Sequence, residues 1–354
     1  MDLPPLLSLA PHRTLLPVGA RTRRIGLCPD AGLLADDLDP PLALMLDELG
    51  SVVAPGPLVE RAAARGADPS AARALLGSLL DAGAVVDASA VRRVAARRAH
   101  HVVLVVGDGP LAAGVVTGLV GAGLVGAGPV GPVGEAHPGG ADGRVGTVHL
   151  AADGVVGGAD LGTGLLDADR GARRGKAVAR AAARLVPDAV VTPPPQRLSP
   201  DLVVLADAQA PPARLVDRLL DDGVAHLPVR LRDGVGVVGP LVLPGRTACL
   251  RCLDLHRADR DPGWPGVAAQ LAGRPGRADP ACVVATAALG TAQALAALDA
   301  SARPPVLDAV LELDVAAATL VTRHWSRHPR CPCGGARHAR ATCGGGPPRG
   351  RLES

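Results

Sequence analysis

Four of the seven cysteines stand in two close pairs, Cys249-Leu-Arg-Cys252 and Cys331-Pro-Cys333. Two cysteines separated by one or two residues can hold one metal ion together, and two such pairs complete the tetrahedral arrangement that zinc prefers. Four cysteine ligands leave no open coordination position, so the ion would have a structural role and not a catalytic one. The alternative is four reduced cysteines without a metal. We predict a structural zinc ion bound by Cys249, Cys252, Cys331 and Cys333.

The start of the chain and the number of cysteines indicate the compartment. The first nine residues contain Asp2 and no basic stretch before an apolar run, so a signal peptide is not expected. An odd number of cysteines in such a chain favours metal binding over disulfides, and we expect a cytoplasmic protein. Cys282 precedes an apolar helix predicted over residues 283–298. It is either a nucleophile acidified by the helix N-terminus or a buried core residue.

A glycine turn, Gly107-Asp-Gly109, joins a predicted apolar strand over residues 102–106 to a helix of small residues. Such a turn lets a phosphate approach a helix N-terminus, as in nucleotide-binding folds. These folds also place an acidic side chain after the second strand, where it binds the ribose, and Asp153 is the candidate here. Gly107, Gly109 and Asp153 are therefore the predicted nucleotide-binding residues. The alternative is a turn of the same shape without a nucleotide.

Lys176 is the only lysine of the chain and lies close to Arg173 and Arg174. The cluster either faces phosphate groups or forms the solvated face of a helix predicted over about residues 170–185. Both interpretations stay open at the level of the sequence.

The residues above are positioned by an alternation of strands and helices that begins near residue 101. The predicted strands and helices are 102–106, 145–148, 170–185, 201–206 and 212–222. Strands that alternate with helices form a parallel, doubly wound sheet of the Rossmann type, so the domain over residues 101–335 is predicted to be α/β. A Gly/Pro-rich insert is expected at 124–144, and a disordered tail at 336–354.

The region before residue 101 is predicted to form a separate small domain. A short strand is followed by three helices, and Asp68 with Pro69 marks the start of the third helix. A terminal wing completes the pattern of a winged helix-turn-helix over residues 23–90. Residues 1–22 are expected to be a flexible arm, and residues 91–100 an Arg-rich linker.

Charge disfavours two classes of partner. The formal charge of +3 is small for 354 residues, and the nearly uncharged stretch over 101–133 is too rich in glycine and proline for a membrane span. Residues 23–88 contain five arginines against ten acidic residues, whereas binding to nucleic-acid phosphates needs the opposite sign. We therefore expect no membrane and no nucleic acid among the partners. A DNA-binding regulator is the least favoured of the functions considered.

Longer motifs resemble the ThiF/MoeB/HesA superfamily of activating enzymes. The run Gly239-Pro-Leu-Val-Leu-Pro-Gly-Arg-Thr-Ala-Cys-Leu-Arg-Cys252 is similar to a strand and the first zinc half-site of that family. The runs Arg260-Asp-Pro-Gly-Trp-Pro265 and His328-Pro-Arg-Cys-Pro-Cys-Gly334 resemble the actinobacterial branch of the family, and the latter looks like its second half-site. The resemblance covers about residues 20–335.

The resemblance implies a ThiF-type, Rossmann-like domain behind an N-terminal winged helix, in a branch linked to thiazole- and oxazole-modified peptides. There the winged helix looks like the clamp that binds the leader of a precursor peptide. The peptide would add a strand beside the clamp's own strand, near residues 24–27. A YcaO-type cyclodehydratase is the implied enzyme partner, and a homodimer is a further expectation.

The resemblance also implies a pocket for ATP and Mg²⁺, in which several residues are replaced here. The acidic residue of the second strand falls on Ala151, and the pocket lysine falls on Arg174, or on Lys176 in a register shifted by two. The family's Asp-x-x-Asp-Asn element falls on residues 205–209, in which only Asp207 can serve. Adenylation needs Mg²⁺ and cationic groups around a triphosphate, and several of those groups are missing.

Two functions follow from this comparison with the family. The missing pocket residues favour a largely non-catalytic, leader-peptide-binding protein that docks with a cyclodehydratase. The alternative is an active ATP-dependent adenylyltransferase that acts on a protein C-terminus or a small carboxylate. In that case Asp207, Lys176 and Arg173 are the catalytic candidates.

Overall fold

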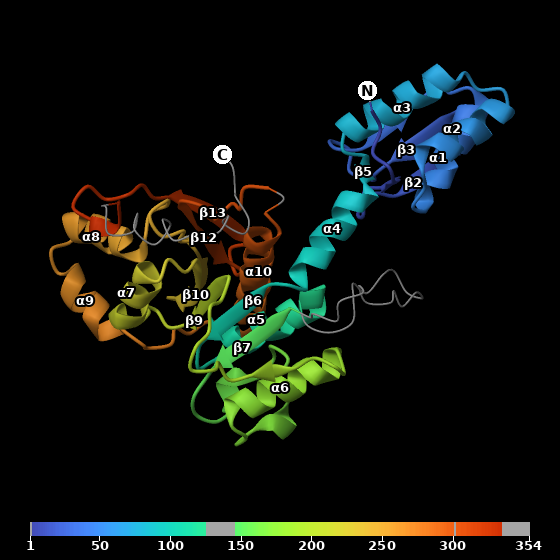
Figure 1. The fold of residues 1–354 in the computed structure, drawn as a ribbon. Helices are drawn as coiled ribbons and strands as arrows, with labels where there is room; N and C mark the ends of the chain where they lie inside the picture. Colours follow the sequence, from blue (N-terminus) through green and yellow to red (C-terminus); the bar gives the residue numbers. More distant parts are fainter. Residues whose placement is uncertain (1, 125–145, 301, 335–354) are drawn as a thin grey trace. The chain divides into compact units, whose positions relative to one another are not determined.

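A computed structural model describes residues 2–124, 146–300 and 302–334. The chain divides into two compact units, Met1–Val94 and Ala95–Ser354, which are described separately below (Figure 1). The insert expected at 124–144, apart from its first residue, and the tail expected at 336–354 lie outside the described residues.

The first unit contains two small antiparallel sheets. One sheet has the order β2-β3-β4, with bounds Leu15–Gly19, Thr22–Ile25 and Leu33–Ala35. In the other sheet β1 (Leu7–Leu9) pairs with β5 (Val85–Asp87). Because β3 is the central strand of its sheet, it has no free edge. The expectation that a peptide adds beside residues 24–27 is therefore wrong, and the available edges of this sheet belong to β2 and β4.

Three helices complete the first unit: α1 (Pro40–Asp47), α2 (Pro55–Ala64) and α3 (Pro69–Asp81). Each begins with a proline, whose missing N–H costs nothing in the first turn. Asp68 caps α3 by accepting the backbone N–H groups of Ser70 and Ala71 at 3.0 and 3.3 Å, which confirms the predicted start of this helix. The helices bury leucines against Ile25 of β3. The assignment of these elements to the winged-helix class stays a prediction.

Residues 2–22 differ from the flexible arm that the sequence suggested. Leu7 of β1 is 0% exposed and belongs to the core of the first unit. Its backbone also exchanges hydrogen bonds with Val53 at 2.7 and 2.8 Å. The apolar residues of this segment pack against the core that the helices form, and this burial keeps the segment in place. The domain therefore begins near residue 3 and not at residue 23.

The second unit is built on an eight-stranded sheet with the order β13-β12-β11-β10-β9-β6-β7-β8. The five parallel strands are β6 (Val102–Val106), β7 (Thr147–Ala151), β8 (Val191–Thr192), β9 (Leu202–Asp207) and β10 (His226–Arg232). The antiparallel strands are β11 (Val235–Val238), β12 (Ala309–Asp314) and β13 (Thr319–His324). This confirms the mostly parallel, Rossmann-like sheet expected from the alternating pattern.

Helices pack against this sheet and follow most of its parallel strands. Their bounds are α5 (Pro110–Leu119), α6 (Arg174–Leu185), α7 (Ala213–Asp221), α8 (Leu250–Arg260), α9 (Trp264–Leu271) and α10 (Pro280–Asp299). The Arg-rich segment expected as a linker is part of a helix, α4 (Ala88–Arg98). Its last residue, Arg98, forms two hydrogen bonds with Asp299 at 2.6 and 2.7 Å.

Helices α5 and α10 pack closely together because small residues face each other (Figure 1). A Cβ atom at Gly114 would lie 2.6 Å from the side chain of Ala287, and one at Gly118 would lie 2.6 Å from that of Thr291. Within the described part of the chain, α10 alone is long and apolar enough to cross a membrane, with a mean hydropathy of 1.7. Half of that segment is buried inside the unit, as is usual for the core helix of an α/β domain.

Candidate functional site

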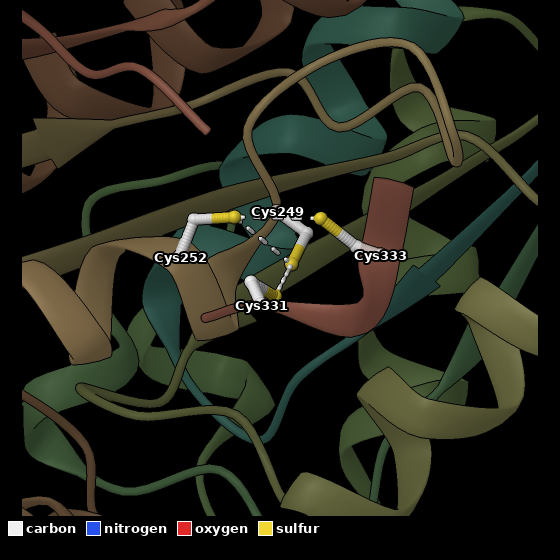
Figure 2. A group of neighbouring side chains, drawn as sticks. All are labelled: Cys249, Cys252, Cys331 and Cys333. Carbon is white, nitrogen blue, oxygen red and sulfur yellow. Dashed lines mark hydrogen bonds between the residues drawn. The ribbon is translucent and has the colours of Figure 1, made fainter. Parts of the chain in front are cut away.

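The four predicted zinc ligands meet in one buried cluster, although 82 residues separate Cys249 from Cys331. Cys249 is the N-cap of α8 and Cys252 lies in its first turn, while Cys331 and Cys333 flank the start of a 3₁₀ turn at Pro332–Gly334. The Sγ–Sγ distances are 3.7 Å for Cys249–Cys252, 3.6 Å for Cys249–Cys331 and 3.4 Å for Cys252–Cys333. Figure 2 shows the four thiols pointing toward a common centre.

This geometry is that of a tetrahedral thiolate site. With Zn–S bonds of about 2.3 Å, tetrahedral coordination places the sulfur atoms ~3.8 Å apart, and all four sulfurs here lie within 4.8 Å of one another. His328, which is close in sequence, has both ring nitrogens engaged: Nε2 bonds Asp259 at 2.7 Å, and Nδ1 accepts the N–H of Arg330 at 3.1 Å. The cluster can therefore bind a metal ion through its four cysteines, with His328 in a supporting position.

Proton affinities within the cluster are unequal. A hydrogen bond from Cys249 lowers the pKa of the Cys252 thiol to about 4, whereas burial raises the pKa of Cys333 to about 12. The cluster therefore contains both thiolate and thiol at neutral pH. A divalent metal replaces the remaining protons when it binds, because only thiolates are ligands.

The second site lies at the carboxyl ends of β6 and β9, which are parallel neighbours. From β6 the chain continues toward β7 on one side, and from β9 toward β10 on the other, so this is the topological switch point where doubly wound folds bind ligands. A cavity of about 420 Å³ opens here. Its wall includes Gly107, Asp153 and Asp207 of the predicted site.

Asp207 occupies the anion position at the start of α5. Its Oδ1 accepts the N–H of Leu111 at 2.9 Å, and its Oδ2 accepts the N–H of Ala112 at 3.2 Å. A Cβ atom at Gly107 or Gly109 would lie 2.6 Å from a carboxylate oxygen of Asp207, so both glycines make room for this carboxylate. Backbone N–H groups at a helix N-terminus are the donors that hold phosphate in nucleotide-binding folds. Here the protein's own side chain uses them.

The charge around this cavity is negative. Asp108, Asp153 and Asp207 line it, and no lysine or arginine stands among the described residues of its wall. The Asp108 carboxylate accepts the backbone N–H of Asp153, which ties the glycine turn to the end of β7. Burial raises the pKa of Asp207 to about 6, although three backbone N–H groups oppose this shift. Asp207 is therefore ionised at neutral pH, but at an energetic cost.

The basic residues predicted for the site lie elsewhere. Arg173 and Lys176 are exposed and do not line the cavity. Arg174 pairs with the buried Asp160 at 3.0 Å and donates to the backbone oxygen of Asp153, so its charge is used within the loop. The structure thus brings Gly107, Gly109, Asp153 and Asp207 together, whereas Arg173 and Lys176 are outside the wall, although Gly175 next to Lys176 lines it; the functional roles assigned to all six stay predictions.

The helix expected over 283–298 begins earlier, so Cys282 lies in the first turn of α10 and not before it, and it is 3% exposed within the main core. Its environment is that of a buried core residue. Sequence reasoning missed a further group, a set of arginines on β10 and α8 that surrounds a second cavity. The available signal was Arg230, a charged residue between apolar neighbours in the interior of β10.

Comparison with known proteins found similar folds among solved structures. No family model and no curated protein matches the chain. The microcin C7 biosynthetic enzyme MccB in complex with N-formylated MccA is similar over 93% of this chain and 100% of that chain, with a TM-score of 0.66 and 12% identity. Escherichia coli MccB with ATP is similar over the same shares, with a TM-score of 0.64 and 12% identity.

A heterocyclase in complex with substrate and cofactor is also similar, over 94% of this chain and 40% of that chain, with a TM-score of 0.57 and 14% identity. At such identities the likeness concerns the fold. This likeness of fold agrees with the resemblance of the cysteine motifs. The two observations are independent, since one comes from the structure and the other from the sequence. The chain therefore has the fold of the ThiF-type activating enzymes.

Proposed function

We propose that this protein is a precursor-peptide-binding partner in peptide modification, and that its activating-enzyme-like unit is a scaffold without adenylation activity. The observation that carries the second part is the position of the Asp207 carboxylate on the N-terminus of α5. ATP would have to displace this carboxylate, or bind without the backbone donors that the glycine turn supplies in nucleotide-binding folds.

Electrostatics opposes ATP further. Two unit charges of the same sign ~4 Å apart repel by about 4 kcal/mol near a protein surface. The triphosphate would meet Asp108, Asp153 and Asp207 in the wall of the cavity, with no arginine or lysine among the described wall residues. The loss of one group that stabilises developing charge commonly reduces a rate by ~100-fold or more. The fold has a cavity where a nucleotide could bind, but the acidic residues that line this cavity do not favour adenylation.

Two observations support peptide binding. MccB was solved in complex with N-formylated MccA, and the similar heterocyclase was solved with its substrate. The first unit also offers a strand edge at β4, which pairs with β3 alone in its sheet. The other edge, β2, contains Pro17 and an irregular register between Pro17 and Gly19, and both features hinder strand addition. We therefore assign the peptide to the β4 edge, in a winged-helix clamp.

The remaining expectations from the sequence become part of this proposal. The metal in the cysteine cluster is zinc with a structural role. The enzyme that acts on the bound peptide is a YcaO-type cyclodehydratase, the protein works in the cytoplasm, and two copies form a homodimer. Nucleic acid and membrane are not partners.

Peptide binding is tested by fluorescence anisotropy with a labelled precursor peptide encoded beside this gene. Leu34 on β4 and Leu16 on β2 both lie opposite Arg24 on the sheet and are 59% and 39% exposed. We expect Leu34→Asp to weaken peptide binding by about tenfold or more, and the matched Leu16→Asp to have little effect. Equal effects of the two variants, or tight salt-sensitive binding of duplex DNA in place of peptide, would contradict the assignment.

Catalysis is tested by ATP–pyrophosphate exchange. The cavity of about 420 Å³ at the switch point is the observation that favours the alternative, an active adenylyltransferase. We expect no exchange by the wild type and no change of its melting temperature with ATP and Mg²⁺. Robust exchange that is abolished in Lys176→Ala or Asp207→Ala would establish the adenylyltransferase instead.

A further inference from the structure

A second cavity of about 310 Å³ lies in the second unit, between β10 and the helices α7, α8 and α9. It shares Pro211 with the wall of the switch-point cavity and is otherwise lined by different residues. Four arginines line it: Arg230, Arg232, Arg251 and Arg257. The acidic residues of its wall are Asp217 and Asp254. No function proposed above uses this cavity.

Arg230 is the unusual member of this set. It is 5% exposed, yet its guanidinium forms no hydrogen bond or ion pair with any residue in the described ranges. Its neighbours have acidic partners: Arg232 pairs with Glu312 at 2.9 Å, a carboxylate that also pairs with Arg323, and Arg257 pairs with Asp254 at 3.3 Å. Nearly all buried polar groups are satisfied, and a buried unpaired charge is particularly costly. Arg230 is therefore a cation that faces a cavity without a counter-charge in contact.

The guanidinium keeps its charge under ordinary conditions. Burial, together with the nearby Arg257 and Arg232, lowers the pKa of Arg230 to about 10. A group with this pKa is still protonated at neutral pH. The two exposed groups of the wall, Arg251 and Asp217, have opposite signs. Among the described residues of the wall, Arg230 is thus the buried arginine that has no acidic partner in contact.

Apart from Gln209 and the charged residues named above, the wall is formed by apolar residues and Trp264. Val216, Leu250 and Leu253 are buried core residues that line the cavity. Trp264 donates its Nε1–H to Asp254 at 3.0 Å, and the guanidinium carbon of Arg257 lies 4.8 Å from the centre of the Trp264 ring. A few placed polar groups among apolar walls are typical of small-molecule pockets, and the volume is at the lower end of their range.

We infer that this cavity binds a monoanionic carboxylate carried on an apolar body, with the carboxylate on Arg230 and the body against Leu250, Leu253 and Trp264. A planar guanidinium presents paired N–H donors that match the two oxygens of a carboxylate. One carboxylate supplies the counter-charge in contact that Arg230 lacks. The inference goes beyond the proposed function and does not depend on it.

The test uses 4-methylpentanoate as the probe and its neutral amide, 4-methylpentanamide, as the matched ligand. The chain has two tryptophans and no tyrosine, so the variant Trp325→Phe leaves Trp264 as the only strong fluorophore. We expect the carboxylate to change Trp264 fluorescence in a saturable way and to raise the melting temperature of the full-length chain. The amide should do neither. Arg230→Met should weaken carboxylate binding by ~10- to 100-fold, the loss of a charge-assisted hydrogen bond.

Two controls separate ligand binding from structural support. Arg214→Met removes an exposed arginine of α7 outside the wall and should leave binding unchanged. Arg230→Met should fold with an equal or higher melting temperature, because it removes an unpaired buried charge. Equal binding of carboxylate and amide, unchanged binding in Arg230→Met, or no saturable response at tens of millimolar carboxylate would overturn the inference. Tighter binding of phenyl phosphate than of benzoate would overturn the carboxylate assignment.

Discussion

Replacing Asp207 by asparagine measures what the buried carboxylate costs the fold. Asparagine cannot ionise, and its single oxygen keeps an acceptor for one of the two N–H groups of Leu111 and Ala112. It also tolerates the left-handed backbone of this position, where φ is 70°. The variant therefore removes the charge and one of the two acceptors, whereas alanine would leave both N–H groups without an acceptor.

The expected magnitude and sign follow from the pKa. The pKa of Asp207 is raised from 3.8 to about 6 in the folded state, chiefly by burial. Below the lower value the residue is protonated in both states. Between the two values only the folded state holds the proton, so the stability of the wild type falls as pH rises through this window. At about 1.4 kcal/mol per pKa unit, the total loss above pH 6 is about 3 kcal/mol.

The assay is urea unfolding of both proteins at several pH values from 4 to 7.5. Both tryptophans, Trp264 and Trp325, lie in the second unit, so their fluorescence reports its unfolding. We expect the stability of Asp207→Asn relative to wild type to rise by about 2.4 kcal/mol between pH 4 and pH 7, because part of the total change lies below pH 4. Asp169→Asn is the control, because a backbone N–H of Leu166 and Arg180 lower the pKa of the buried Asp169 to about 2. Its stabilising contribution is lost only as pH falls below about 4, so its difference from wild type should be flat over this range.

One result would refute the reasoning. If the difference between Asp207→Asn and wild type is independent of pH from 4 to 7, the carboxylate is not held at an energetic cost. Its place on α5 would then be that of an ordinary helix cap, and the electrostatic argument against ATP would lose its main support. A difference that changes in the opposite direction would show that the backbone donors outweigh burial.

The remaining predictions concern the metal, one ion pair and the thiols. Elemental analysis should find about one zinc per chain; Cys331→Ser should lose it and lower the melting temperature, whereas Cys28→Ser, at an exposed cysteine, should do neither. Arg98→Met should lower the free energy of unfolding by about 2 kcal/mol in urea titrations, because it leaves the buried Asp299 unpaired; Arg97→Met, at an exposed neighbour, should change it little. Mass spectrometry after brief alkylation should find Cys28 modified and the buried Cys282 protected; rapid alkylation of Cys282 would show that its surroundings open readily.

Features that depend on neighbours in the sequence could be predicted. The bounds of β6 agree with its apolar run, and the cap of α3 follows from Asp68 and Pro69. The cysteine cluster could also be predicted, because each half-site is a local motif and four close thiolates commonly bind a metal ion. Its closeness in space, across 82 residues, needed only the assumption of a shared metal.

Features that depend on distant partners could not be predicted. Asp207 reaches the start of α5 across 96 residues, and its role as internal anion follows from the order of the strands. The central position of β3 likewise depends on β2, which the sequence pattern assigned to an arm. The exposed position of Lys176 and the cavity around Arg230 are set by packing between elements, for which a single sequence gives no direct signal.

The close contact between α5 and α10 has a thermodynamic consequence for a chain with no phenylalanine and no tyrosine. Glycine and alanine have no side-chain rotamers to lose on folding, whereas long side chains lose up to ~2 kcal/mol each. Small side chains bury less apolar area per residue, so each contributes less hydrophobic stabilisation. Because these residues also let two backbones approach closely, the helices gain dispersion contacts between main-chain atoms at almost no cost in side-chain entropy. The core of this unit thus compensates for its lack of phenylalanine and tyrosine through low entropy loss and close backbone packing.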